Sequence, residues 1–346
     1  MRSARQSHSS TLALYEKAYK ALIVRIKPVI LLPYFGSIPP YFGTYLKSLE
    51  GKAMDVLWIS DLEVPCHPEN FKIVKMSFAD VGRRAESALG AKVVMNGGRR
   101  LCDFRPMYAK IFEDLIGDYD YWGWGDCDLV YGRSFNQFLE RTVGTGQYDA
   151  VSMHSAYMSG PTCFCRNTPL LRDIYRKAAN WRDVCAFEGT GGILIFDECG
   201  GEFHAQLSAG DMTMDDCEKE RDSFSAVLWR EPGLNLYRAD EICEESLADG
   251  KVVKMEDGVL TLDGKEISVY HFNLAKIPHY FRYAHIQYHK VGKYRIVRTG
   301  FYVSDLAWAT RCIRGPWRMS IAALKSFRKH GLGHVARRFL GWISKK

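Results

Sequence analysis

Residues Tyr119–Gly132 read Y-D-Y-W-G-W-G-D-C-D-L-V-Y-G, and this stretch decides how the rest of the chain is interpreted. The tyrosines, tryptophans and glycines that precede Asp126 predict a strand covered on both sides. Asp126, Cys127 and Asp128 end that strand. Alternate residues of an extended segment share a face, so the two carboxylates are expected to point the same way.

Two neighbouring carboxylates repel each other and are costly to remove from water. A hard divalent cation relieves that repulsion, and Mg²⁺ typically binds through one or two carboxylates together with substrate phosphates. Asp126 and Asp128 therefore predict a metal–diphosphate site at the carboxyl end of a strand, where open α/β sheets bind ligands. The alternative is a solvated turn, in which Gly and Asp are common.

The composition indicates a globular, reduced protein. The 346 residues are 47% hydrophobic and 13% aromatic, enough for one large α/β domain and too apolar for global disorder. The ten cysteines include no C-x-x-C pair, which argues against a structural zinc site and favours a cytosolic location. No apolar run approaches the ~20 residues of a membrane-spanning helix, and the N-terminus has no signal-peptide pattern.

The order of predicted elements indicates an α/β fold. Buried-strand runs alternate with helical segments, and such an order predicts a mostly parallel sheet with helices on both faces. The strands are expected at Val29–Leu32, Asp55–Ser60, Phe71–Met76, Tyr148–Met153, Thr162–Arg166 and Val269–Phe272. The helices are expected at Tyr41–Leu49, from Ser77 as N-cap, from Pro106 to about Ile116, at Ser134–Thr142 and at Leu170–Ala179. Asp257-Gly258 predicts a hairpin turn.

The chain is expected to form one domain between two extensions. Residues 1–27 carry apolar residues at roughly helical spacing, residues 28–299 form the main domain, and residues 300–346 form a basic amphipathic tail. From Leu306 to Lys346 there are ten Lys or Arg residues and no Asp or Glu, so of the total charge of +7 the preceding chain carries −3. Basic residues interleaved with Trp and Phe favour contact with an anionic membrane surface. One alternative is that the tail forms a helix packed on the domain. Another is that the tail binds nucleic acid, although the domain offers no recognition motif for it.

Several stretches together resemble a known family. The segments are Pro33–Gly36 with Pro40-Tyr41-Phe42, Trp58–Asp61, Leu101–Tyr108, Tyr121–Leu129 and Phe196-Asp197-Glu198. They resemble the glycosyltransferase-like family of bacterial capsule and lipopolysaccharide gene clusters, within the GT-A group of nucleotide-sugar transferases. The resemblance covers roughly residues 28–275. It departs from the family pattern after Met153, where Ser159-Gly160 replaces a Gly-His pair.

The resemblance implies a role for individual residues. It implies that Pro33, Tyr34, Phe35 and Gly36 receive the nucleotide base and ribose, that Asp61 hydrogen-bonds base or ribose, and that Asp103 and Arg105 contact the donor sugar or diphosphate. It implies that Asp126, Asp128 and His271 hold Mn²⁺ or Mg²⁺, and that Asp126 also contacts the donor. It places Asp197 or Glu198 as the acidic residue that faces the acceptor.

The resemblance thus implies a metal-dependent transferase that moves a sugar from a UDP- or GDP-type donor to a cell-surface glycan or lipid-linked glycan. The enzyme would be cytoplasmic and peripheral on the inner face of the membrane. An inverting reaction needs a base at the acceptor hydroxyl, whereas a retaining reaction does not, and the sequence leaves both open. Two alternatives also remain open: a metal-dependent nucleotidyl or phosphoryl transferase, and a non-catalytic nucleotide-sugar or glycan-binding module.

Overall fold

A computed structural model describes residues 26–303, except 190–191, 202, 214–215, 217–221, 248–249, 274–287 and 289–290. The first half contains β1 (Pro28–Pro33), α2 (Phe42–Leu49), β2 (Asp55–Ser60), β3 (Phe71–Lys75), α3 (Phe78–Leu89), α4 (Leu101–Phe104), α5 (Tyr108–Ile111), β4 (Tyr121–Gly125), β5 (Leu129–Tyr131), α6 (Ser134–Arg141), β6 (Ala150–Ser152) and β7 (Thr162–Arg166). The second half contains α7 (Pro169–Asp173), α8 (Trp181–Ala186), α9 (His204–Ala209), α10 (Phe224–Arg230), β8 (Leu236–Arg238), β9 (Ile242–Cys243), β10 (Val252–Glu256), β11 (Val259–Leu262), β12 (Lys265–Glu266), β13 (Val269–His271), β14 (Tyr294–Val297) and β15 (Gly300–Tyr302).

The main sheet has seven strands in the order β3-β2-β1-β4-β7-β6-β8. Strand β7 runs antiparallel to β4 and β6, and the other pairings in this sheet are parallel. Every residue of β1 is buried, as expected for a continuous apolar run in a parallel strand covered on both faces. The predicted mixed α/β fold with a mostly parallel sheet is confirmed.

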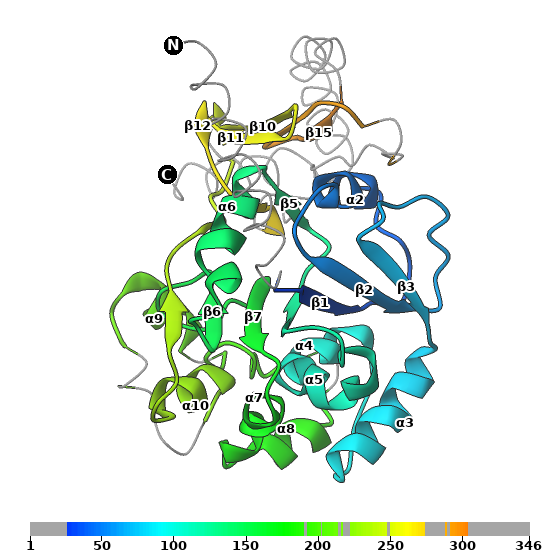
Figure 1. Ribbon diagram of the computed structural model, residues 1–346, viewed down its shortest axis with the longest axis vertical. Coiled ribbons are helices and arrows are strands. Elements are labelled where there is room, and N and C mark those ends of the chain that lie inside the picture. The colour runs from blue at the N-terminus through cyan, green and yellow to red at the C-terminus, as the bar shows by residue number, and fades with distance from the viewer. Residues whose placement is uncertain are drawn as a thin grey trace, which may run out of the picture.

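Alternate residues of the central strands pack against helices on opposite faces. Val29 and Leu31 belong to a core cluster with side chains of α3, α4, α5, α8 and α10. Ile30 and Leu32 belong to a second cluster with α2 and α6. Figure 1 shows α2 and α6 on the side of the sheet that faces β10 to β12, and α3, α4 and α5 on the other side.

Two smaller sheets cover the α2 and α6 side. One has the order β5-β13-β9, and the other has the order β12-β11-β10-β14-β15. Their apolar side chains form a separate cluster that includes Val130, Tyr270 and Phe301. The predicted Asp257-Gly258 hairpin joins β10 to β11, and both turn residues have a positive φ.

The predictions of local secondary structure are confirmed in part. Ser77 is the N-cap of α3, and its side chain forms a capping box with Asp80. The expected helix from Pro106 to about Ile116 is instead a single 3-10 turn, the four-residue helix α5 and a second 3-10 turn at Glu113–Leu115, because the chain leaves helical geometry at Phe112, whose φ is −115°. Asp126–Asp128 lies in a turn between β4 and β5 instead of an extended segment.

The expected extension over residues 1–27 and the basic tail fall outside the described residues, apart from 26–27 and 300–303. Among the residues that are described, no helix is long and apolar enough to cross a membrane.

Candidate functional site

The carboxyl edge of the main sheet collects most of the predicted site residues. Strands β1, β2 and β4 are parallel, so Tyr34, Asp61 and Asp126, which follow them, lie on one edge. Successive strands lead outward from β1 to β2 and β3 on one side, while β4 pairs with β1 on the other. Such a switch in strand order opens a crevice at the carboxyl edge, where α/β sheets bind ligands.

Strand pairing brings His271 to the two aspartates. His271 ends β13, which pairs antiparallel with β5, and its partner in register is Leu129. The backbone N–H of Phe272 donates to the carbonyl of Asp128 at 3.2 Å, which fixes the end of β13 against the turn. One potential ligand atom from each of Asp126, Asp128 and His271 lies within 4.8 Å of the others. The structure thus assembles these three residues into a candidate site for a divalent ion.

The histidine of this cluster lies between carboxylates. Its Nε2 is 3.4 Å from Asp128 Oδ1, and its Nδ1 contacts Glu244 Oε1. Burial lowers the pKa of His271, but hydrogen bonds to Asp128 and Glu244 and the negative charge of the aspartates raise the pKa to about 10. Two carboxylates and one imidazole suit a divalent cation such as Mn²⁺.

This environment predicts that metal affinity rises with pH. A protonated imidazole cannot bind a metal, so an ion that binds His271 below its pKa must displace a proton. The apparent Mn²⁺ affinity should therefore increase across the neutral range, by up to about tenfold per pH unit. Calorimetric titrations in two buffers of different protonation enthalpy measure the released proton. A Mn²⁺ affinity that does not change with pH, without proton release, would show that the ion displaces no proton from His271.

Arg105 connects the metal cluster to the loop that carries Asp197 and Glu198. Its guanidinium contacts Asp126 Oδ1 and donates to Asp197 Oδ2 at 2.7 Å. Burial raises the pKa of Asp197 to about 7, and the Arg105 charge opposes that rise. The nearby carboxylates of Asp103 and Asp114 pair with other arginines, Arg100 and Arg84. Arg105 thus holds Asp126 in place beside the predicted metal position.

Asp103 lies behind the site and not on its surface. Its side chain is fully buried against Arg100, and it accepts hydrogen bonds from the backbone N–H groups of Leu194 and Phe196 at 2.9 and 3.3 Å. Between them Ile195 has a φ of 55°, a strained conformation for a β-branched residue. The structure therefore buries Asp103, where it holds the loop that carries Asp197.

Glu198 is aimed at a neighbouring loop. Its Oε1 accepts a hydrogen bond from the backbone N–H of Gly160 at 3.0 Å. A Cβ at position 160 would lie 2.1 Å from this oxygen, so the contact requires glycine. Gly160 belongs to the segment where the sequence departs from the family pattern, and Pro161 in that segment accepts from the backbone N–H of Asp126 at 2.9 Å. Glu198 is partly exposed, whereas Asp197 is buried.

The Pro33–Gly36 loop is held against the end of β2. The Tyr34 ring stacks on Trp58 with centroids 5.0 Å apart. The Ser60 hydroxyl donates to the Tyr34 carbonyl at 2.6 Å, and Asp61 follows as an exposed residue. Burial, with Cys127 and Asp128 nearby, raises the pKa of Tyr34 to about 12. The loop, Asp61 and the aspartate turn therefore share one edge.

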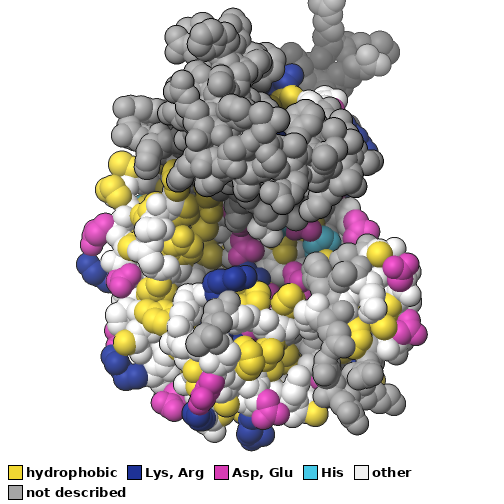
Figure 2. Space-filling model, turned by 180° about the vertical axis from the view of Figure 1, so that it is seen from behind, with side chains coloured by type: hydrophobic (Ala, Val, Ile, Leu, Met, Phe, Trp, Pro, Cys, Tyr) yellow, Lys and Arg dark blue, Asp and Glu magenta, His cyan; other side chains and the backbone are white. Residues whose placement is uncertain are grey.

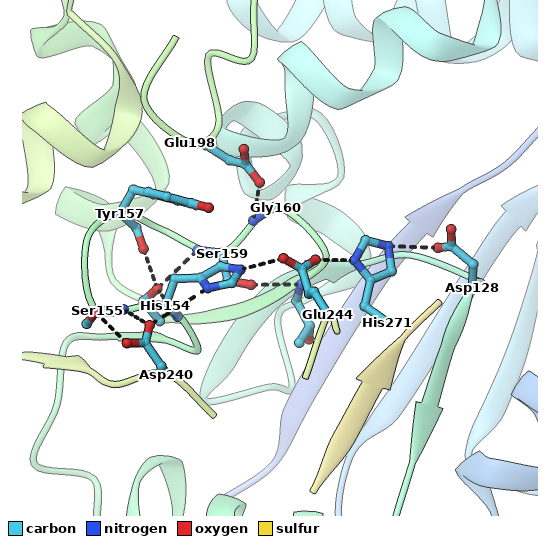
Figure 3. A network of polar contacts seen from close by, with 12 residues as sticks. Asp128, His154, Ser155, Tyr157, Ser159, Gly160, Glu198, Asp240, Glu244 and His271 are labelled. Carbon is cyan, nitrogen blue, oxygen red and sulfur yellow. Dashed lines mark hydrogen bonds and ion pairs between the residues drawn. The ribbon is translucent and has the colours of Figure 1, made fainter. Parts of the chain in front are cut away.

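Sequence reasoning missed His154, Asp240 and Glu244. Figure 3 shows these residues in a continuous polar network with His271 and Asp128. His154 and Asp240 follow β6 and β8, which run parallel to β4, and so reach the same edge as Asp126. The one available signal was the position of His154 just after the predicted strand Tyr148–Met153, because no strand was predicted before Asp240 or Glu244. In Figure 2, acidic and basic side chains and a histidine lie together near the middle of one face of the molecule.

Comparisons with known proteins identify a family. Residues 30–304 match a family described as a family of unknown function, DUF6625, and the chain therefore belongs to it. A search of the curated proteins finds no match. Among solved structures, the chain is similar to the crystal structure of mouse xyloside xylosyltransferase 1 in its apo form. That similarity has 11% sequence identity and a TM-score of 0.37, and it covers 72% of this chain and 98% of the other.

Proposed function

We propose that this member of the DUF6625 family is a metal-dependent glycosyltransferase that moves a sugar from a nucleotide-sugar donor to a glycan acceptor. One observation carries the proposal: Asp126, Asp128 and His271 converge at the carboxyl edge of the sheet, where the strand order switches between β1 and β4. A divalent ion held there would bind the diphosphate of the donor, as ions held by one or two carboxylates commonly do.

Different residues of the chain are proposed to bind different parts of the donor. Tyr34 and Asp61 would receive the base and ribose of a UDP- or GDP-type donor. Asp126, Asp128 and His271 would hold Mn²⁺ or Mg²⁺, which would stabilise the negative charge on the leaving diphosphate. Arg105 keeps Asp126 oriented through its ion pair. Asp197 holds Arg105 from behind at 2.7 Å, so Asp197 acts through Arg105 and does not contact the acceptor.

Glu198 is the better placed of the two acidic candidates for the acceptor. It is partly exposed, and the Gly160 N–H fixes one of its oxygens. In an inverting reaction Glu198 takes the proton of the acceptor hydroxyl while that oxygen bonds to the sugar carbon and the bond to the diphosphate breaks.

The cellular acceptor is proposed from the sequence. Resemblance to the family of bacterial capsule and lipopolysaccharide gene clusters supports a cell-surface or lipid-linked glycan. The ten basic residues of Leu306–Lys346 support attachment to the anionic inner face of the membrane. Co-sedimentation of the full chain with anionic and with neutral lipid vesicles tests the attachment, and equal recovery with both would contradict it.

Ligand-dependent thermal stability tests the proposed activity. The protein is heated with a panel of nucleoside diphosphates and nucleotide sugars, with and without Mn²⁺, because a ligand that binds only the folded state raises the melting temperature. We expect one nucleotide class to give a metal-dependent shift, and that donor to yield a glycosylated acceptor. Diphosphate release without sugar transfer would favour a phosphoryl or nucleotidyl transferase. Binding without turnover would favour a binding module, and no shift with any nucleotide would contradict the proposal.

Gly160→Ala tests whether the position of Glu198 matters. The added methyl meets the carboxylate end of Glu198, so the carboxylate must move away and the Gly160 N–H loses its acceptor, at a cost of about 1–3 kcal/mol to stability. Transfer activity should fall toward that of Glu198→Gln, which loses a base contribution of about 10²–10⁴-fold. Steady-state rates and melting temperatures give the comparison.

Gly117→Ala is the matched control, because a Cβ there meets no atom within 4 Å. It should leave both the rate and the melting temperature unchanged.

Full activity in Glu198→Gln would exclude Glu198 as the base and favour a retaining reaction.

A further inference from the structure

Glu244 reaches His271 through strand pairing. Strand β9 runs parallel to β13, with Ile242 opposite Val269 and Cys243 opposite Tyr270. Glu244 and His271 are the next residues along these two strands. Their side chains meet on the side of His271 that faces away from Asp128, as Figure 3 shows.

The two ring nitrogens of His271 therefore have different partners. Nδ1 contacts Glu244 Oε1, and Nε2 faces Asp128 Oδ1 at 3.4 Å. An ionised carboxylate accepts hydrogen bonds and cannot donate them. When the imidazole is neutral, Glu244 holds the proton on Nδ1, so the lone pair lies on Nε2 and points toward the aspartates.

A second histidine lies beside Glu244. Glu244 Oε2 is 3.6 Å from His154 Nε2, and His154 Nδ1 is 3.9 Å from Asp240 Oδ1. The backbone N–H and hydroxyl of Ser155 donate to Asp240 at 2.9 and 2.8 Å. The polar chain Asp128–His271–Glu244–His154–Asp240 thus extends from the metal cluster to the loop after β6.

We propose that Glu244 is a positioning residue that selects Nε2 of His271 as the metal-binding nitrogen. The inference rests on the proposed metal site and deepens it. A carboxylate behind a ligating histidine fixes the tautomer and the ring orientation and makes the nitrogen a stronger ligand. Removing such a partner typically lowers metal affinity by about 10–100-fold.

The test compares two adjacent glutamates in the full chain. Glu244→Gln keeps the shape of the side chain but removes its charge, and Glu244→Ala removes the acceptor altogether. Glu245→Gln is the matched control, because Glu245 pairs with Lys251 at the surface. Calorimetric titration with Mn²⁺ should show affinity about 10–100-fold lower in the Glu244 variants, with alanine the weaker binder, and unchanged affinity in the control.

A spectroscopic measurement separates positioning from a general effect on folding. Echo-modulation EPR of bound Mn²⁺ detects the coupling of a ligating imidazole nitrogen. The wild-type protein should show this coupling, His271→Ala should lose it, and Glu244→Ala at saturating Mn²⁺ should show it altered or lost. If the Glu244 variants keep wild-type affinity and coupling, the inference fails while the metal site stands. If the wild-type protein does not bind Mn²⁺, the proposed metal site itself fails.

Discussion

Replacing Asp128 with asparagine is expected to abolish sugar transfer while leaving the protein folded. Asp128 is almost completely buried, and asparagine occupies the same space without the charge that a cation needs. A metal ion contributes several kcal/mol to stabilising the charge of a transition state. A loss of about 4 kcal/mol corresponds to a rate lower by about 10³-fold.

The matched control for this variant is Asp120→Asn. Asp120 precedes β4, whereas Asp126 and Asp128 follow it, and its carboxylate accepts from the backbone N–H of Lys27 at 2.8 Å. The control should keep wild-type Mn²⁺ affinity and wild-type rates. Both variants are compared by Mn²⁺ titration and by single-turnover transfer. Substantial transfer by Asp128→Asn at saturating Mn²⁺ would show that this aspartate is not a ligand.

Asp103→Ala is expected to cause the largest loss of stability, about 3–5 kcal/mol. Asp103 is 0% exposed and Arg100 is 2% exposed, so alanine leaves a buried guanidinium without its counter-charge. The variant also removes the acceptor of the Leu194 and Phe196 N–H groups. The loop that carries Asp197 and Glu198 should then lose its strained conformation, and transfer activity should fall with stability.

Denaturant unfolding of three variants measures this effect. Asp173→Ala is the surface control, because Asp173 forms an exposed pair with Arg176 that should contribute no more than about 1 kcal/mol. Arg100→Met combined with Asp103→Leu removes both charges, and it should be less destabilising than Asp103→Ala alone. A loss below about 1 kcal/mol for Asp103→Ala would show that Arg100 finds another partner or water.

The features predicted correctly from the sequence are local ones. The buried runs at Val29–Leu32 and Asp55–Ser60, the Ser77 cap and the Asp257-Gly258 turn depend on neighbours within a few residues of each other. The strand before Asp126 could be recognised for the same reason. Since parallel strands end on one edge, the convergence of Tyr34, Asp61 and Asp126 also follows from the order of the elements.

The interaction partners of charged residues could not be predicted from neighbouring residues in the sequence. His271 was assigned to the metal site only by family resemblance. Glu244 and His154 carried no signal in composition or spacing, and nothing in the sequence indicated the contact of Arg105 with Asp197. Each of these contacts joins elements far apart in the sequence, and each depends on how two strands or loops are aligned.

The sequence alone therefore determined most strands of the main sheet and where the carboxylates leave that sheet, because these properties depend on burial and on local hydrogen bonds. Only the tertiary structure decided which charges meet. The pairing of β13 with β5 and β9 places Asp128 and Glu244 on opposite sides of one imidazole. A shift of one residue in either pairing would turn His271 to the other face of its strand and separate it from both carboxylates.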